Sequence, residues 1–149
     1  MGINFDTIVC TVGSAGTYAG LLIANKALAL EKKIVGFSVS NSTEEFTART
    51  KELFQEAGKY LGEEIDASDD INIIDDYIGL GYALSQPEAL EFIKDFAKSE
   101  GIILDPVYTG KCMYGFYNEL EKGTFKDSEN ILFIHTGGIF GVFPSKDLF

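Results

Sequence analysis

A short turn rich in glycine and hydroxyl residues constrains this chain more than any other feature. It occupies residues 13–17, Gly-Ser-Ala-Gly-Thr, after an apolar run at residues 8–12 and before a helical pattern at residues 18–30. A strand, a tight turn and a helix in this order leave free backbone N–H groups at the helix start, where a phosphate can bind. The turn lacks both the spaced glycines of dinucleotide-binding loops and the Gly-Lys-Ser/Thr ending of P-loops. It predicts an anion site of another kind, with the hydroxyls of Ser14 and Thr17 as ligands; a purely structural turn is the alternative.

Apolar strand patterns alternate with helical patterns along the rest of the chain. We expect strands at residues 5–12, 34–39, 71–77 and 131–135. We expect helices at residues 15–30, 43–61 and 87–99, and a last one that follows Lys111 and ends near residue 122. Residues 40–43, Ser-Asn-Ser-Thr, supply turn and N-cap residues for the second helix, and Thr43 followed by Phe46 is close to a capping pattern. Glu44 and Glu45 in the first turn favour the helix dipole. The alternation predicts a single α/β domain over residues 1–149, a mostly parallel sheet with helices on both faces in three αβα layers.

Composition narrows the classes of function. With 12 basic and 23 acidic residues the net charge is −11, which disfavours nucleic acid and anionic lipid as partners. No apolar stretch is long enough to span a membrane and no signal peptide precedes the first strand, so we expect a cytoplasmic protein. The two cysteines and single histidine of the 149 residues predict neither a disulfide framework nor a metal site.

Three polar, glycine-rich turns follow predicted strands. They are residues 13–17, 79–82 and 136–138. The carboxyl ends of parallel strands meet at one edge of a sheet, and ligands of α/β proteins bind at that edge. The sequence therefore predicts one site built from all three turns.

Four motifs in this order resemble one enzyme family. They are Gly-Ser-Ala-Gly-Thr-Tyr-Ala-Gly at residues 13–20, Gly81-Tyr82, Leu-Asp-Pro-Val-Tyr-Thr-Gly-Lys at residues 104–111, and His-Thr-Gly-Gly at residues 135–138. The chain resembles the D-cysteine desulfhydrase and 1-aminocyclopropane-1-carboxylate (ACC) deaminase family over essentially its whole length. The resemblance implies a fold-type II enzyme dependent on pyridoxal 5′-phosphate, with the large-domain fold of the tryptophan synthase β-subunit.

The resemblance also implies roles for individual residues. Tyr108 is the reactive aromatic residue that faces the amino-acid substrate, and Tyr82 is its partner. Because a phenol has a pKa of about 10, Tyr108 needs a neighbour or the cofactor to act as a base near neutrality. Thr109 and Thr136 are expected near the pyridine nitrogen. The residues expected to hold the cofactor phosphate are Gly13, Ser14, Ala15, Gly16 and Thr17.

Thr109 indicates the reaction within this family. Deaminase members carry Glu after the tyrosine, and a carboxylate there keeps the ring nitrogen protonated. Desulfhydrase-like members carry Thr, as this chain does at position 109. The resemblance thus implies β-elimination of D-cysteine or a related D-amino acid to pyruvate, ammonia and sulfide, ahead of ring opening of ACC.

Family members are longer, and their N-terminal portion carries the lysine that binds the cofactor covalently. The sequence begins at a point that resembles the middle of a family member. Three alternatives stay open: a piece that is inactive alone, one half of a split desulfhydrase or deaminase that needs a separate N-terminal chain, or a non-catalytic module that binds phosphate or sulfate. We also expect a homodimer, because a sheet edge or apolar face is left uncovered.

Two residues of the helix that follows Tyr108 have simple structural interpretations. Lys111 is expected to be solvated, as lysines at helix starts usually are. Cys112 is expected to be a small buried apolar side chain rather than a reactive thiol.

Overall fold

Four parallel strands form the centre of the protein. The computed structural model describes residues 2–149. The strands are β1 (Thr7–Val12), β2 (Lys33–Ser38), β3 (Ile73–Ile74) and β4 (Ile131–Phe133), in the sheet order β3-β2-β1-β4. Val9 of β1 is in register with Val35 of β2 and Phe133 of β4. Because every pairing is parallel, the carboxyl ends of the strands share one edge of the sheet.

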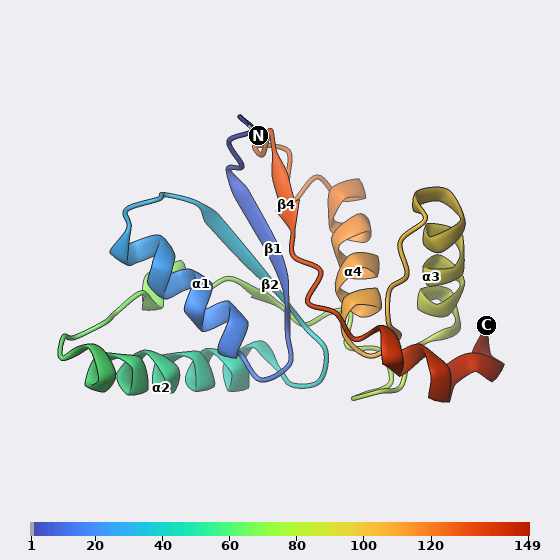
Figure 1. Ribbon diagram of the computed structural model, residues 1–149, viewed down its shortest axis with the longest axis horizontal. Coiled ribbons are helices and arrows are strands. Elements are labelled where there is room, and N and C mark those ends of the chain that lie inside the picture. The colour runs from blue at the N-terminus through green and yellow to red at the C-terminus, as the bar shows by residue number, and fades with distance from the viewer. Residues whose placement is uncertain (1) are drawn as a thin grey trace.

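Helices cover both faces of this sheet. The helices α1 (Gly16–Ala27) and α2 (Thr43–Leu61) lie on one face, and α3 (Pro87–Glu100) and α4 (Thr109–Glu121) lie on the other (Figure 1). Two short 3-10 segments, η1 (Ser68–Asp70) and η2 (Ile139–Leu148), complete the described chain. This arrangement confirms the three-layer αβα architecture predicted from the sequence.

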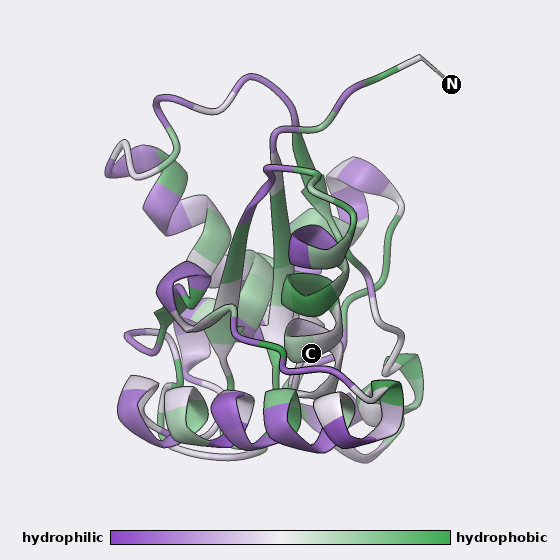
Figure 2. Ribbon diagram, turned by 90° about the vertical axis from the view of Figure 1, so that its left-hand side faces the viewer, coloured by the Kyte–Doolittle hydropathy of each residue, from purple (hydrophilic) through white to green (hydrophobic). Residues whose placement is uncertain are grey.

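A separate apolar core fills each side of the sheet. On the α1 and α2 side, Val12, Tyr18 and Phe54 are buried together. On the α3 and α4 side, the core includes Phe37 and Phe116. Figure 2 shows the strands in hydrophobic colours, whereas the long helix α2 alternates between hydrophilic and hydrophobic segments. Each surface helix therefore buries one stripe of side chains, as an αβα layer requires.

Several predicted element limits shift by a few residues, and the clearest differences from the sequence prediction have local causes. The third strand is only Ile73–Ile74, because the next carboxylate, Asp75, accepts the backbone N–H of Thr43 at 2.6 Å instead of continuing the ladder. Helix α1 begins at Gly16, because Ala15 has the left-handed φ of 64°. Helix α2 is capped by Ser42 and not by Thr43: the Ser42 hydroxyl accepts the N–H of Glu45, whose carboxylate accepts the N–H of Ser42.

The two cysteines are free and buried. Burial raises the pKa of the Cys10 thiol to about 12, and burial raises the pKa of the Cys112 thiol as well. This confirms the expectation that Cys112 is a buried apolar side chain. Within residues 2–149, no helix combines the length and apolarity that crossing a lipid bilayer would require.

Candidate functional site

The turn after β1 presents open hydrogen-bond donors. Ala15 is the N-cap residue of α1 and provides no side-chain acceptor. The first backbone bond of the helix runs from the N–H of Ala19 to the carbonyl of Ala15 at 2.8 Å. The N–H groups of Gly16, Thr17 and Tyr18 precede it and have no partner within the helix. These donors, at the positive end of a 12-residue helix, suit an anion.

The hydroxyl residues of this turn are accessible. Ser14 and Thr17 are exposed, whereas the methyl group of Ala15 is packed in the core at 2% exposure. The left-handed conformation of Ala15 costs about 1 kcal/mol in a residue other than glycine. Strain of this kind is common where a turn is shaped for a ligand. Four of the five residues of the predicted phosphate turn, Gly13, Ser14, Gly16 and Thr17, are thus exposed, and Ala15 is buried beneath them.

Tyr108 packs directly against this turn. A β-carbon at position 13 would lie 3.2 Å from Cε1 of Tyr108 and 3.4 Å from its Cδ1. A side chain at position 13 would therefore press on the ring and displace it by a few tenths of an ångström, whereas glycine leaves room for this close packing. The first predicted turn and the motif at residues 104–111 consequently meet at the same edge of the sheet, although they are far apart in the sequence.

Tyr82 and Tyr108 form a phenol pair. Their hydroxyl groups are hydrogen-bonded, and their rings meet edge to face, with centroids 5.9 Å apart and planes at 72°. The hydrogen bond to Tyr82 raises the pKa of Tyr108, and burial and the Asp105 charge act in the same direction. In this state Tyr108 keeps its proton near neutrality. The pair can hold a proton and pass it on, and Tyr108 acts as a base only after another group lowers its pKa.

The third turn completes a small cavity. Tyr108, Thr136, Gly137 and Gly138 line a hollow of about 250 Å³. His135 anchors this turn, because its Nε2 contacts the carbonyl of Ile103 at 3.0 Å and its Nδ1 accepts the N–H of Gly137 at 3.1 Å. Tyr108 is therefore shared between the turn at Gly13 and the turn that follows β4.

Asp105 organises the start of α4, a role that the sequence motifs did not predict. Its buried carboxylate accepts the N–H groups of Val107, Tyr108 and Thr109 at 2.8–2.9 Å. A β-carbon at Gly138 would lie 2.7 Å from its Oδ1, so the third turn packs on the same carboxylate. An Asp that precedes a helix start is a recognisable signal, because its side chain accepts the N–H groups two and three residues later.

Thr109 lies below the site instead of facing it. It is fully buried, and its hydroxyl donates to Oδ1 of Asp105 at 2.7 Å and accepts the N–H of Asp105 at 3.0 Å. The hydroxyl is thus bonded to Asp105, and its proximity to a pyridine nitrogen stays a prediction. Thr136 is exposed and lines the cavity. Of the two threonines, only Thr136 is brought to the site.

Lys111 is the other residue whose surroundings differ from expectation. Its place at a helix start predicts an ammonium in solvent, but Lys111 is only 2% exposed. Its Nζ lies 2.6 Å from the carbonyl oxygens of both Ile78 and Gly81. These acceptors come from the loop that carries Tyr82, which a pattern along the helix does not reveal.

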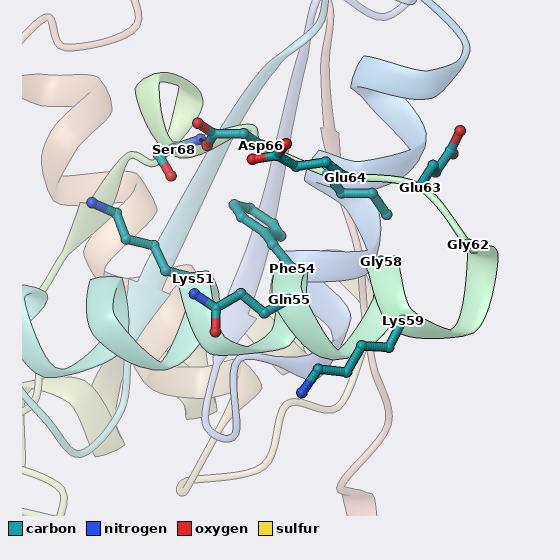
Figure 3. Close-up of a pocket in the computed structure, with 11 residues that line it drawn as sticks. Lys51, Phe54, Gln55, Gly58, Lys59, Gly62, Glu63, Glu64, Asp66 and Ser68 are labelled. Carbon is teal, nitrogen blue, oxygen red and sulfur yellow. Dashed lines mark hydrogen bonds between the residues drawn. The ribbon is translucent and has the colours of Figure 1, made fainter.

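A larger pocket lies elsewhere, along the second half of α2. It has a volume of about 640 Å³ and shares no lining residue with the cavity beside Tyr108. Figure 3 shows Phe54 between α2 and the segment of Asp66 and Ser68, with Lys51 and Lys59 at the helix. No tyrosine, free helix start or glycine-rich strand end contributes to it. Pocket size alone therefore does not identify the candidate site. The hydroxyl groups, the phenol pair and the free helix start all lie at the sheet edge.

Comparison with known proteins identifies the family. The family described as pyridoxal-phosphate dependent enzyme matches residues 1–137. The chain belongs to this family. A solved structure described as an ACC deaminase homologue is 36% identical, with a TM-score of 0.86 over 99% of this chain and 44% of that chain. The chain thus spans less than half the length of that relative. These similarities confirm the fold-type II architecture and pyridoxal phosphate as the cofactor.

The residues at the sheet edge fit this cofactor. The open N–H groups of Gly16 and Thr17 and the exposed hydroxyls of Ser14 and Thr17 match a phosphate. The cavity between Tyr108 and Thr136 is next to them and is available to a ring. When bound, pyridoxal phosphate supplies an electron sink for negative charge that develops on the substrate carbon.

Proposed function

We propose that this chain forms the cofactor-phosphate and tyrosine side of a D-cysteine desulfhydrase-like lyase. The reaction is β-elimination of D-cysteine to pyruvate, ammonia and sulfide. The observation that carries the proposal is the contact of the Tyr108 ring with Gly13, because it joins an anion-binding turn to a hydrogen-bonded phenol pair. An isolated anion site has no need of a phenol pair against its backbone.

Each group of residues has a task in this proposal. The first-turn N–H groups of α1 and the hydroxyls of Ser14 and Thr17 bind the phosphate and fix the orientation of the cofactor. Tyr108 and Tyr82 hold a proton between their phenolic oxygens and transfer it at the substrate. Thr136 borders the cavity together with Tyr108.

The surroundings of position 109 support elimination from D-cysteine. A deaminase-like site needs a carboxylate that keeps the ring nitrogen protonated, and position 109 carries Thr. The nearby carboxylate, Asp105, is buried and already accepts three backbone N–H groups and one hydroxyl. It has little capacity left for a ring nitrogen.

ACC deaminase activity is the second candidate. It is favoured by the 36% identity to a structure described as an ACC deaminase homologue. The two activities are separated by offering D-cysteine and ACC to the same preparation. Sulfide release without 2-oxobutanoate from ACC supports the lyase, and the reverse result replaces it with the deaminase.

We further propose that the isolated chain is inactive and that residues outside it, among them the covalent lysine, complete the enzyme. The chain covers 44% of the homologous structure, so a family-type site draws on residues outside it. Co-expression with the N-terminal portion of a desulfhydrase tests this directly. Sulfide release from D-cysteine only in the co-expressed sample is expected. Turnover by the isolated chain, or a lysine adduct with pyridoxal phosphate after borohydride reduction, would contradict it.

Binding of pyridoxal phosphate tests the phosphate turn. Each hydroxyl that bonds a charged phosphate contributes about 1.5–3 kcal/mol, so Ser14→Ala and Thr17→Ala should each weaken binding by about 10- to 100-fold. Ser99→Ala, on the distant helix α3, is the matched control and should leave binding unchanged.

The alternative of a non-catalytic anion module gives a different pattern. Inorganic phosphate would then bind as tightly as pyridoxal phosphate, since the ring would add no contact. A clear preference for pyridoxal phosphate, reduced by Tyr108→Phe, supports the proposed enzyme.

A further inference from the structure

The ammonium group of Lys111 lies inside the protein with carbonyl oxygens as its acceptors. Its Nζ donates to the carbonyls of Ile78 and Gly81 at 2.6 Å each and to that of Val39 at 3.4 Å. These three acceptors match the three N–H donors of an ammonium group. Within residues 2–149, Lys111 forms no ion pair with a carboxylate.

This placement is unfavourable for Lys111 itself. Burial lowers the pKa of its ammonium, because the charged form loses hydration. Lys111 is also in the first turn of α4, where the positive end of the helix dipole disfavours a cation. An apolar residue of similar length would fill the same space without either penalty. Such an apolar residue could not form the three hydrogen bonds that Lys111 donates to the carbonyls.

Two of these carbonyls belong to the loop that carries Tyr82. The loop has little apolar packing, since Leu80 is 73% exposed and Leu84 is 57% exposed. Internally it has only the bonds between Leu80 and Leu84 and from the N–H of Leu84 to the carbonyl of Gly81. The Ser85 hydroxyl ties its end to the carbonyl of Pro106. Its position next to α4 therefore depends on a few polar contacts, and Lys111 makes two of them.

We infer that Lys111 is a positioning residue that sets Tyr82 against Tyr108 by holding the carbonyl of Gly81. Gly81 directly precedes Tyr82, while Tyr108 is three residues before Lys111 at the start of the same helix. The first turn of α4 thus fixes both members of the phenol pair, because Tyr108 directly precedes it and its residue Lys111 bonds the loop of Tyr82. The inference rests on the proposed function only in giving this pair a role in proton transfer.

Titration of Tyr108, followed by NMR of ring-labelled tyrosine, tests the inference without cofactor or substrate. The signal is assigned with Tyr108→Phe. In the unmodified chain, the Tyr82 hydroxyl raises the pKa of Tyr108. Tyr82→Phe should lower it toward the ordinary value, and Lys111→Met should lower it by a similar amount. The double variant should show no further shift, because both changes remove the same contact. Lys94→Met, at a surface ion pair on α3, is the control and should change nothing.

The direction of the shift separates positioning from other roles. Loss of a nearby cation by charge effects alone would raise the pKa of Tyr108, and a purely structural role would lower thermal stability without moving it. A folded Lys111→Met protein whose Tyr108 titrates unchanged or higher overturns the inference. If this variant does not fold, the pKa of Tyr108 is measured in Lys111→Gln instead and judged in the same way. Because no cofactor is added, failure here leaves the proposed function standing, and failure of pyridoxal phosphate binding leaves this test intact.

Discussion

At the scale of single residues, Tyr108 connects the three turns of the site. Its ring packs on Gly13, its hydroxyl bonds Tyr82, and its side chain borders the cavity with Thr136. Asp105 holds the backbone N–H of Tyr108 and so fixes where that side chain starts. The geometry of the site therefore depends on a buried carboxylate that does not face the cavity.

Asp105→Asn should destabilise the protein by about 2–4 kcal/mol. The amide would turn N–H groups toward backbone donors and leave some of them without an acceptor. Urea unfolding measures the difference, with Asp127→Asn at an exposed position as the control. A loss no greater than that of the control would show that the carboxylate is not what orders the start of α4.

The residue motifs predicted which side chains meet but not how each one is bonded. The turns at residues 13–17, 79–82 and 136–138 predicted a shared site because parallel strands end at one edge, and the family resemblance added Tyr108 to it. The burial of Thr109 and Lys111 was missed. Their partners, Asp105 and the carbonyls of the Tyr82 loop, depend on tertiary placement that no local pattern encodes.

At the scale of elements, Tyr18 fastens α1 to the sheet. It is fully buried, and its hydroxyl accepts the N–H of Asn72 at 2.6 Å and donates to the carbonyl of Asn72 at 3.0 Å. Tyr18→Phe should lower the free energy of unfolding by about 1 kcal/mol, because the N–H of Asn72 loses its acceptor while the Asn72 carbonyl keeps the N–H of Gly36. Tyr60→Phe, at a residue that is 96% exposed, is the matched control. Equal stability of the two variants would rule out this role.

Glu119 makes the end of α4 sensitive to acid. Burial alone would raise its pKa, but hydrogen bonds from Lys122, Thr124 and Tyr77 outweigh burial and lower the pKa to about 2. A carboxylate with a lowered folded pKa stabilises the protein above its unfolded pKa, and this stability is lost as pH falls through the folded value. The free energy of unfolding should therefore fall by on the order of 2 kcal/mol as the pH is lowered from about 4.5 to 2. In Glu119→Gln, the free energy of unfolding should depend less on pH over this range. An unchanged slope in the variant would contradict it.

Helices were predicted more closely than strands because their ends carry local signals. Pro87 starts α3 and Gly101 ends it in the left-handed conformation, as the sequence indicates. The extent of β3 has no such signal. Asp75 leaves the strand pattern to accept the N–H of Thr43, a partner 32 residues away.

At the scale of the whole molecule, exposed apolar side chains predict self-association. In η2, Phe140 is 78% exposed and Phe143 is 67% exposed, with their ring centroids 6.1 Å apart. Burial of these two exposed rings at an interface with a second copy would be favourable. Light scattering should show a homodimer, and Phe140→Ser with Phe143→Ser should shift it toward monomer. A monomer at all concentrations would refute this prediction.

Backbone amide NMR during titration with pyridoxal phosphate tests the central claim most directly: the turn at residues 13–17 and Tyr108 are two sides of one cofactor site. The amides of Gly16 and Thr17 and the ring of Tyr108 should shift together, with a single apparent affinity that Ser14→Ala weakens. Shifts confined to the larger pocket along α2, at Lys51 and Lys59, or shifts of the turn without any response of Tyr108, would contradict the claim.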